Sequence, residues 1–340
     1  IAAGAPLAAS GALEGSFAPA VATDAEALAC GADVVIVAVP GFGLKPVIDA
    51  LVPHLRSGQP VIFSAHLSFA ALFLGTRLAA RGVSLPIVTW GTTLAVARQN
   101  EGRDAVKFHT LRKRIDVATL PAAVAGEGLA LCQALFGDRF VPRNGLLAIS
   151  LSNVNPQNHM GISLCNLTRI ENGEVWPLSG NVTPAVGRLL EALDAERLAI
   201  AAELGLEVRS VIDHFQLSFD VPRGSVHAMN QEIHRRGQGG NGPVGADTRY
   251  VTEDVPYGLQ VTATLGELVG RPARLHRIGV EVFSALYGRD FAAENRLLAA
   301  MDLPSLSLDA LRTAAATGVL PRLVEDCATP GPAAAPTARG

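Results

Sequence analysis

Residues 33–40 read Asp-Val-Val-Ile-Val-Ala-Val-Pro, an almost continuous β-branched run that ends at a proline. Such a run is typical of a strand that is buried on both faces, as in a parallel sheet covered by helices. Two similar runs follow at residues 60–64 and 86–90, and helical patterns at residues 47–55 and 70–81 lie between the three. This alternation of strand and helix predicts a doubly wound α/β domain.

The flanking segments extend this domain. Residues 1–23 predict short strands or loop, residues 115–120 predict a further strand, and residues 121–135 predict a helix. A turn at Pro142-Arg143-Asn144-Gly145 then marks a boundary, because its residues favour turns over regular structure. We therefore expect the first domain to span residues 1–146.

The pattern after this boundary is helical. Asn155, Thr183 and Asp254 each precede a proline by one or two residues, which is the signal of an N-cap followed by the first helical position. Apolar residues then recur at spacings of three and four. The sequence predicts an all-α domain over residues 147–327 and a disordered, Ala/Pro/Thr-rich tail over residues 328–340.

The composition excludes several classes of protein. The 340 residues are 49% hydrophobic and 17% charged, with a net charge of −3, which argues against disorder and against a nucleic-acid partner. The longest apolar stretch, residues 60–75, contains two serines and a histidine and is shorter than the ~20 residues of a membrane-spanning helix. No basic segment opens the chain, so no signal peptide is expected. These features predict a cytoplasmic protein without a membrane partner.

One expected motif of a dinucleotide-binding domain is missing. Such a domain normally opens with a strand, a glycine-rich turn and a helix, so that backbone N–H groups can approach the pyrophosphate. Gly41-Phe42-Gly43 follows the first buried run, but residues 44–46 do not continue the motif, which favours a simple turn at the strand end. Either the domain binds no dinucleotide, or the chain begins part-way into such a domain; we favour the second alternative.

Two segments of the second half read as signatures. Residues 152–159 are Ser-Asn-Val-Asn-Pro-Gln-Asn-His, and residues 249–259 are Arg-Tyr-Val-Thr-Glu-Asp-Val-Pro-Tyr-Gly-Leu. Together with Thr-Thr-Leu-Ala-Val-Ala-Arg at 92–98 and Leu-Asp-Ala-Glu-Arg at 193–197, they resemble the octopine/nopaline (opine) dehydrogenase family. The resemblance implies a Rossmann-type domain followed by an all-helical domain. It also implies that roughly forty residues, with the first strand and the glycine turn, precede this chain.

The resemblance further implies a reductive condensation. In that family an amino acid joins a 2-keto acid, commonly pyruvate, as an imine, and NADH or NADPH delivers hydride to the imine carbon. The expected partners are therefore an amino acid and a 2-keto acid, and the expected cofactor is NAD or NADP. Matching by motif makes His159 the general acid/base, Asp254 its partner and Arg249 the anchor of a substrate carboxylate. The oligomeric state stays open, with a homodimer as one alternative.

The residue types suit this chemistry. Histidine titrates near ~6.5, close to operating pH, and a carboxylate on its other ring nitrogen fixes the tautomer. His159 and Asp254 each lie at the start of a predicted helix, so the two helices could face each other across a cleft. Arginine binds a carboxylate with two parallel hydrogen bonds, and Arg249 lies just before Asp254. We expect Asn155 to cap its helix and to help position substrate or nicotinamide.

Further candidates follow from position in the fold. Ligands of α/β sheets bind beyond the carboxyl ends of the strands. No cluster of metal-ligating residues is visible, and hydride donors need no metal. The expected cofactor-binding residues are Val39, Pro40, Gly41 and Phe42, and the expected substrate-binding residues are Thr93, Arg98, Met160, Trp176 and Tyr257. The histidines without supporting context are His66, His109, His214, His227, His234 and His276.

Two other functions remain open. Ketopantoate reductases, glycerol-3-phosphate dehydrogenases and β-hydroxyacid dehydrogenases share the two-domain plan, and they typically use a lysine of the helical domain. This chain has no lysine after Lys113, which argues against that branch. A ketone reductase that uses the His159/Asp254 pair, and a non-catalytic cofactor-binding homologue, are the alternatives.

Overall fold

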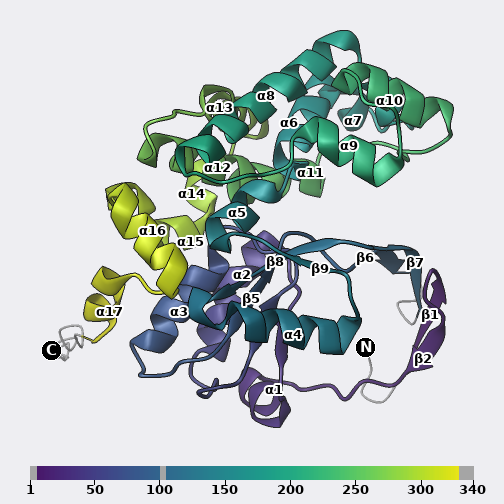
Figure 1. The fold of residues 1–340 in the computed structure, drawn as a ribbon. Helices are drawn as coiled ribbons and strands as arrows, with labels where there is room; N and C mark the ends of the chain where they lie inside the picture. Colours follow the sequence, from purple (N-terminus) through teal and green to yellow (C-terminus); the bar gives the residue numbers. More distant parts are fainter. Residues whose placement is uncertain (1–5, 100–104, 329–340) are drawn as a thin grey trace, which may run out of the picture.

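Two domains make up the molecule. The structure is a computed structural model that describes residues 6–99 and 105–328. Figure 1 shows an α/β domain below and a helical domain above, with helix α5 (Gly145–Ser152) between them. Among the described residues, none of the helices combines the length and the apolar character that crossing a bilayer requires.

A five-stranded sheet with the order β3-β4-β5-β8-β9 forms the centre of the α/β domain. The first three strands are parallel, and β8 runs antiparallel to β5. β4, β5 and β8 are buried along their whole length, which explains why their sequences are rich in β-branched residues. The strands are β3 (Val35–Val37), β4 (Val61–Phe63), β5 (Ile87–Trp90), β8 (Ile115–Leu120) and β9 (Phe140–Pro142).

Helices cover this sheet as the alternating pattern predicts, with one difference at α2. The sequence places that helix at residues 47–55, but it begins at Gly41, directly after β3, and contains Pro46 in its interior. A long-range contact explains the early start, because the amide of Gly41 donates to the carboxylate of Glu253. The helices are α1 (Ala25–Gly31), α2 (Gly41–Leu51), α3 (Ala70–Ala79), the 3₁₀ turn Ala122–Val124 and α4 (Ala125–Phe136).

A second, four-stranded sheet with the order β2-β1-β7-β6 lies beside the first. Its strands are largely exposed, so they lack the apolar pattern that marked the buried strands. The short strands expected near the start of the chain are present, whereas the hairpin of β6 and β7 was not predicted. The strands are β1 (Leu7–Gly11), β2 (Gly15–Phe17), β6 (Ala95–Gln99) and β7 (Ala105–Leu111).

The helical domain packs around two clusters of buried apolar side chains, one centred on Trp176 and one on Phe283. The predicted N-cap Thr183 is confirmed, because its hydroxyl accepts a hydrogen bond from Val186 N. The helices are α6 (Asn155–Cys165), α7 (Leu167–Glu171), the 3₁₀ turn Ser179–Asn181, α8 (Pro184–Glu203), α9 (Val211–Phe219), α10 (Val226–Arg235), α11 (Arg249–Thr252), the π-helical turn Val255–Leu259, α12 (Gln260–Leu268), α13 (Arg274–Tyr287) and α14 (Phe291–Glu294).

The last helices pack against the α/β domain, and the expected span of the helical domain, residues 147–327, remains a prediction. Leu311 and Leu320 are buried in the same cluster as Leu72 of α3, and Figure 1 shows α17 beside α3. An apolar helix face does not reveal which surface it covers. The expected disordered tail falls, from residue 329 onward, outside the described residues. These elements are α15 (Arg296–Met301), the 3₁₀ turn Leu303–Ser305, α16 (Leu308–Thr317) and α17 (Pro321–Ala328).

Candidate active site

His159 and Asp254, 95 residues apart in the chain, are in direct contact. His159 Nδ1 lies 2.7 Å from Asp254 Oδ2, and the two side chains are 20% and 15% exposed. A carboxylate at this distance accepts a hydrogen bond from Nδ1, which places the ring proton on Nδ1 and so fixes the tautomer. Nε2 is then the ring atom available to a substrate. The predicted meeting of these two residues is confirmed; their catalytic role remains a prediction.

A tyrosine that the sequence analysis did not single out orients the imidazole. The ring of Tyr250 stacks on that of His159, with centroids 3.6 Å apart and planes inclined by 5°. Burial and the negative charge of Asp254 raise the pKa of Tyr250, and the positive charge of Arg98 acts in the opposite direction. Arg98 lies on β6, and its side chain is exposed. Tyr250 lies within the quoted 249–259 segment, which was the one available signal.

A π-helical turn presents the carboxylate of Asp254. The expected N-cap role of Asp254 is wrong, because the residue is already helical (φ −71°, ψ −28°) and its side chain makes no capping bond. The turn approaches α6 so closely that a Cβ on Gly258 would lie 2.2 Å from Pro156 Cγ. The missing side chain of Gly258 therefore permits the contact between the two segments that carry the pair. Single π-helical turns are frequent at functional sites.

Asn155 does not cap helix α6. It is the first residue of the helix, and it is exposed. Its backbone amide donates a hydrogen bond to the side-chain oxygen of Asn153 at 3.1 Å. The segment Asn153-Val154-Asn155 offers two asparagines, and the sequence does not show which of them precedes the helix. The role of Asn155 toward a substrate stays a prediction.

Arg249 is held next to the pair by an ion pair of its own. Its Nε donates to Glu253 Oε2, and its side chain is 73% exposed. Glu253 is buried, and its other oxygen accepts the amide of Gly41 at 3.0 Å. The two terminal nitrogens of Arg249 make no bond within the described part of the chain, so they can bind a carboxylate as a fork. Glu253, which the sequence analysis gave no role, thus links the arginine to the start of α2.

The remaining candidates divide between surface and core. Thr93 is exposed, and its hydroxyl donates to the carbonyl of Ala95 at 2.9 Å. Met160 and Trp176 are 2% and 1% exposed and lie inside the apolar clusters of the helical domain, so their positions do not support a role in lining a substrate cleft. Large apolar side chains at helical spacing are more often core than ligand contacts, and the pattern could not separate the two uses.

Tyr257 joins the two domains. A Cβ on Gly41 would lie 2.5 Å from the Tyr257 ring, and the Tyr257 hydroxyl donates to the carbonyl of Glu294 at 3.2 Å. Val39 and Pro40 lead from β3 into this contact, and Phe42 is 65% exposed. Gly41-Phe42-Gly43 is thus the first turn of α2, packed against the helical domain. The expected cofactor role of these residues remains a prediction.

The fold and this site together define a two-domain protein, in which an α/β domain precedes a helical domain that carries a histidine–aspartate pair. Comparison with known proteins identifies the family. The model of the NAD/NADP octopine/nopaline dehydrogenase α-helical domain matches residues 142–287. The opine dehydrogenase of Arthrobacter sp. (strain 1C) is 31% identical over 287 residues, which cover 83% of this chain and 79% of that protein. The chain belongs to the octopine/nopaline (opine) dehydrogenase family of NAD(P)-dependent oxidoreductases that act on CH–NH bonds.

Other relatives agree with this assignment. The vitopine synthase of Allorhizobium ampelinum is 26% identical over 303 residues, which cover 85% of this chain and 80% of that protein. A solved octopine dehydrogenase in complex with NADH and agmatine superposes with a TM-score of 0.76 at 16% identity, over 93% of this chain and 87% of the other. The expected family, the fold class and the expected use of NAD or NADP are therefore confirmed.

One buried ring nitrogen at the carboxyl end of β4 suits the carboxamide of a nicotinamide cofactor. His66, in the loop after β4, accepts the amide of Ala71 on Nε2, which leaves the ring proton on Nδ1. Within the described residues, that buried Nδ1 has no hydrogen-bond partner. His66 lines a cavity of about 20 Å³ together with Ser68 and Tyr257. Burial lowers the pKa of His66 to about 3, so the ring is a neutral donor suited to an uncharged acceptor such as a carboxamide oxygen.

Proposed function

We propose that His159 is the general acid/base of a reductive condensation between an amino acid and a 2-keto acid, with Asp254 as the residue that orients it. The observation that carries the proposal is the 2.7 Å contact from Nδ1 to Oδ2, on a ring that is still one-fifth exposed. A positioned base of this kind contributes about 10²- to 10⁴-fold to a rate. The same pair is the expected proton source in a chain that has no lysine after Lys113.

The assigned proton steps take place at Nε2 of His159. Condensation of an amine with a ketone forms a C=N bond and releases one water, which requires a proton to leave the nitrogen and another to reach the departing oxygen. NADH or NADPH supplies the hydride for the C=N carbon. Asp254 stabilises the imidazolium that forms while the ring carries the extra proton. The stacked ring of Tyr250 limits the orientations of the imidazole.

Arg249 is the residue that we assign to a substrate carboxylate. The ion pair with Glu253 uses Nε of Arg249 and fixes the plane of the guanidinium. The terminal nitrogens belong to a side chain that is 73% exposed, so a substrate carboxylate can reach them. Solved octopine dehydrogenase structures contain arginine in one case and pyruvate in another. Pyruvate is therefore the first 2-keto acid to test, and arginine the first amino acid.

The test is an assay of nicotinamide oxidation in the full chain. NADH and NADPH are each supplied with pyruvate alone and with pyruvate plus single amino acids, and the product is identified by mass spectrometry. We expect oxidation that depends on the amino acid, with a secondary-amine product. Equal rates with pyruvate alone would replace the proposal by a ketone reductase that uses the same pair. Tight nicotinamide binding without turnover on any pair would favour a non-catalytic homologue.

A further inference from the structure

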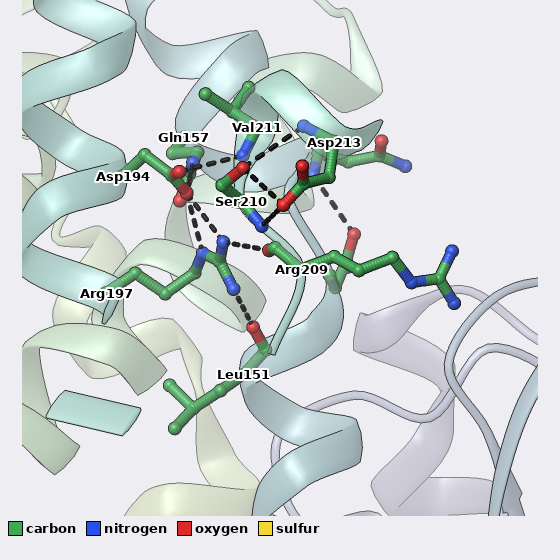
Figure 2. Close-up of polar contacts among 10 residues, drawn as sticks. Leu151, Gln157, Asp194, Arg197, Arg209, Ser210, Val211 and Asp213 are labelled. Carbon is green, nitrogen blue, oxygen red and sulfur yellow. Dashed lines mark hydrogen bonds and ion pairs between the residues drawn. The ribbon is translucent and has the colours of Figure 1, made fainter. Parts of the chain in front are cut away.

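A buried ion pair on α8 connects the segments that lead to His159. It belongs to the Leu-Asp-Ala-Glu-Arg segment at residues 193–197. Asp194 and Arg197 are 4% and 1% exposed, and Asp194 Oδ1 lies 2.6 Å from Arg197 Nη2 and 3.0 Å from Arg197 Nε. Figure 2 shows this pair with its partners from α5, α6 and the segment that leads into α9.

Asp194 binds the helix that carries the catalytic histidine. Its Oδ1 accepts from Gln157 Nε2 at 2.7 Å, and its Oδ2 accepts from Val211 N, also at 2.7 Å. Gln157 is 1% exposed and lies two residues before His159 on α6. The carboxylate therefore joins the first turn of α6 to the first turn of α9.

Arg197 binds the end of the helix that connects the two domains. Its Nη1 donates to the carbonyl of Leu151, and its Nη2 donates to the carbonyl of Arg209 at 2.6 Å. Leu151 lies in the last turn of α5, where backbone carbonyls have no partner inside the helix. Together, Asp194 and Arg197 hold both sides of the short turn between α5 and α6.

The group continues into the α/β domain. The guanidinium of Arg209, whose carbonyl Arg197 binds, lies 2.5 Å from Asp116 Oδ1 on β8. Asp116 is also paired at 2.8 Å with Arg143, which precedes α5. A connected series of polar contacts thus runs from α8 through the segment before α9 to the main sheet.

We propose that the Asp194–Arg197 pair is a positioning site for the reaction, which fixes the turn between α5 and α6 and so the place of His159 relative to the α/β domain. The inference rests on the proposed role of His159. A buried ion pair is weak evidence for stability by itself, because apolar residues of similar volume are often equally stable. A requirement for one geometry of the turn explains the pair better, since a 1 Å displacement at a reacting centre can cost about 10²-fold in rate.

The test replaces both charges together, so that neither is left buried and unpaired. In the Asp194→Leu/Arg197→Met variant of the full chain, we expect faster amide hydrogen exchange in residues 151–157. We also expect kcat with pyruvate and an amino acid to fall about 10²-fold, with the same nicotinamide Kd and the same pH profile as the parent. Gln157→Leu breaks only the link to α6 and should give a smaller fall of the same kind, which keeps the test usable if the double variant does not fold.

A matched control lies on the same helix. Glu191 of α8 accepts from Val226 N at 2.7 Å and so joins α8 to α10, away from α5 and α6. Glu191→Gln should leave kcat and the exchange of residues 151–157 unchanged. The inference is overturned if kcat of the double variant and of Gln157→Leu stays at the parent value, or if Glu191→Gln lowers it equally. Full turnover by His159→Ala would instead reject the proposed function, whereas the exchange data would still report on the turn.

Discussion

Within residues 6–99 and 105–328, two histidine–carboxylate pairs have almost the same geometry in different surroundings. His159 Nδ1 lies 2.7 Å from Asp254, and His276 Nδ1 lies 2.9 Å from Glu196. The ring of His159 is 20% exposed, whereas that of His276 is 2% exposed. Distance alone therefore does not separate a candidate proton donor from a structural residue; access to the second ring nitrogen does.

The second pair serves the start of a helix. Besides the ring of His276, Glu196 accepts the amides of Leu275 and His276, in the first turn of α13. Burial acts to raise the pKa of Glu196, but these hydrogen bonds outweigh it and lower the pKa overall. Burial also lowers the pKa of His276. Among the described residues, the hydrogen bonds of this carboxylate join α8 to the start of α13, as a helix cap does.

Removing His159 should produce the largest difference between the two pairs. We expect His159→Ala to lower kcat by about 10²- to 10⁴-fold, because a general acid/base contributes about that much. Nicotinamide affinity should stay the same, which a fluorescence titration of NADH checks. Turnover within a few-fold of the parent would show that His159 is not the general acid/base. The two histidines would then not differ in function.

Removing the negative charge of Asp254 should have a smaller effect through the same ring. Asp254→Asn leaves a side chain that can still bond His159 but does not stabilise the imidazolium, so we expect kcat to fall about 10- to 10³-fold. The two residues act as a unit, so the Asp254→Asn/His159→Ala double variant should be no slower than His159→Ala alone. If steady-state kinetics show that the fold-loss of kcat in the double variant is the product of the two single losses, the residues act independently.

The matching change in the buried pair should affect stability and spare catalysis. We expect His276→Ala to lower the free energy of unfolding by about 3 kcal/mol, because it removes one partner of a buried hydrogen-bonded pair. Urea unfolding measures this change, and kcat should remain within a few-fold of the parent at a temperature where the variant is folded. A loss of kcat comparable to that of His159→Ala would mean that the two pairs do not differ in kind.

The sequence predicted the strands better than it predicted the pairs. The buried run that contains β3 is a local signal, because a strand covered on both faces must be apolar at every position. The stacking of Tyr250 on His159 joins residues of two helices, and nothing in the neighbourhood of either residue in the chain specifies it. The family resemblance singled out the histidine that contacts Asp254. Residue type alone could not, since His276 also has a carboxylate partner.

Capping and domain membership show the same limit. A proline after Asn155 or Asp254 marks the start of helical structure. In the structure, however, the side chain of Asn153 accepts the hydrogen bond from the Asn155 amide. Asp254 precedes a π-helical turn and makes no capping bond. The apolar face of α16 is visible in the sequence, whereas its contact with α5 and β8 is not. What the sequence could not give, in each case, is the identity of the surface on the other side of a contact.

His66 is buried and has no carboxylate partner among the described residues, so it extends the comparison. Burial lowers the pKa of His66 from 6.5 to about 3. The unfolded chain therefore binds a proton at this residue as the pH falls below 6.5, while the folded chain does not, and stability is lost on acidification. Between pH 7 and pH 5 this one group accounts for about 2 kcal/mol of the loss.

Urea unfolding at these two pH values tests the assignment. The loss of unfolding free energy from pH 7 to pH 5 should be about 2 kcal/mol smaller in His66→Gln than in the parent. The exposed His109 provides the control, because His109→Gln should reproduce the loss of the parent. An equal pH dependence in all three proteins would show that His66 is not buried as a neutral ring.

The smallest expected effect concerns the arginine beside the first pair. Arg249→Lys keeps the positive charge but removes the planar fork, so we expect the KM for the 2-keto acid to rise about 10-fold, which corresponds to about 1.4 kcal/mol. kcat should change little, because a carboxylate that is bound equally in ground state and transition state contributes to KM alone.

Arg271 is a matched control for this substitution. Its Nε pairs with Glu203 at 2.9 Å, and its side chain is 60% exposed, so it is an exposed arginine with a carboxylate on Nε, as Arg249 is. Arg271→Lys should leave both constants unchanged. A KM that stays at the parent value in Arg249→Lys would reject the anchor. A fall in kcat without a rise in KM would instead place Arg249 among the groups that act on the transition state, next to His159 and Asp254.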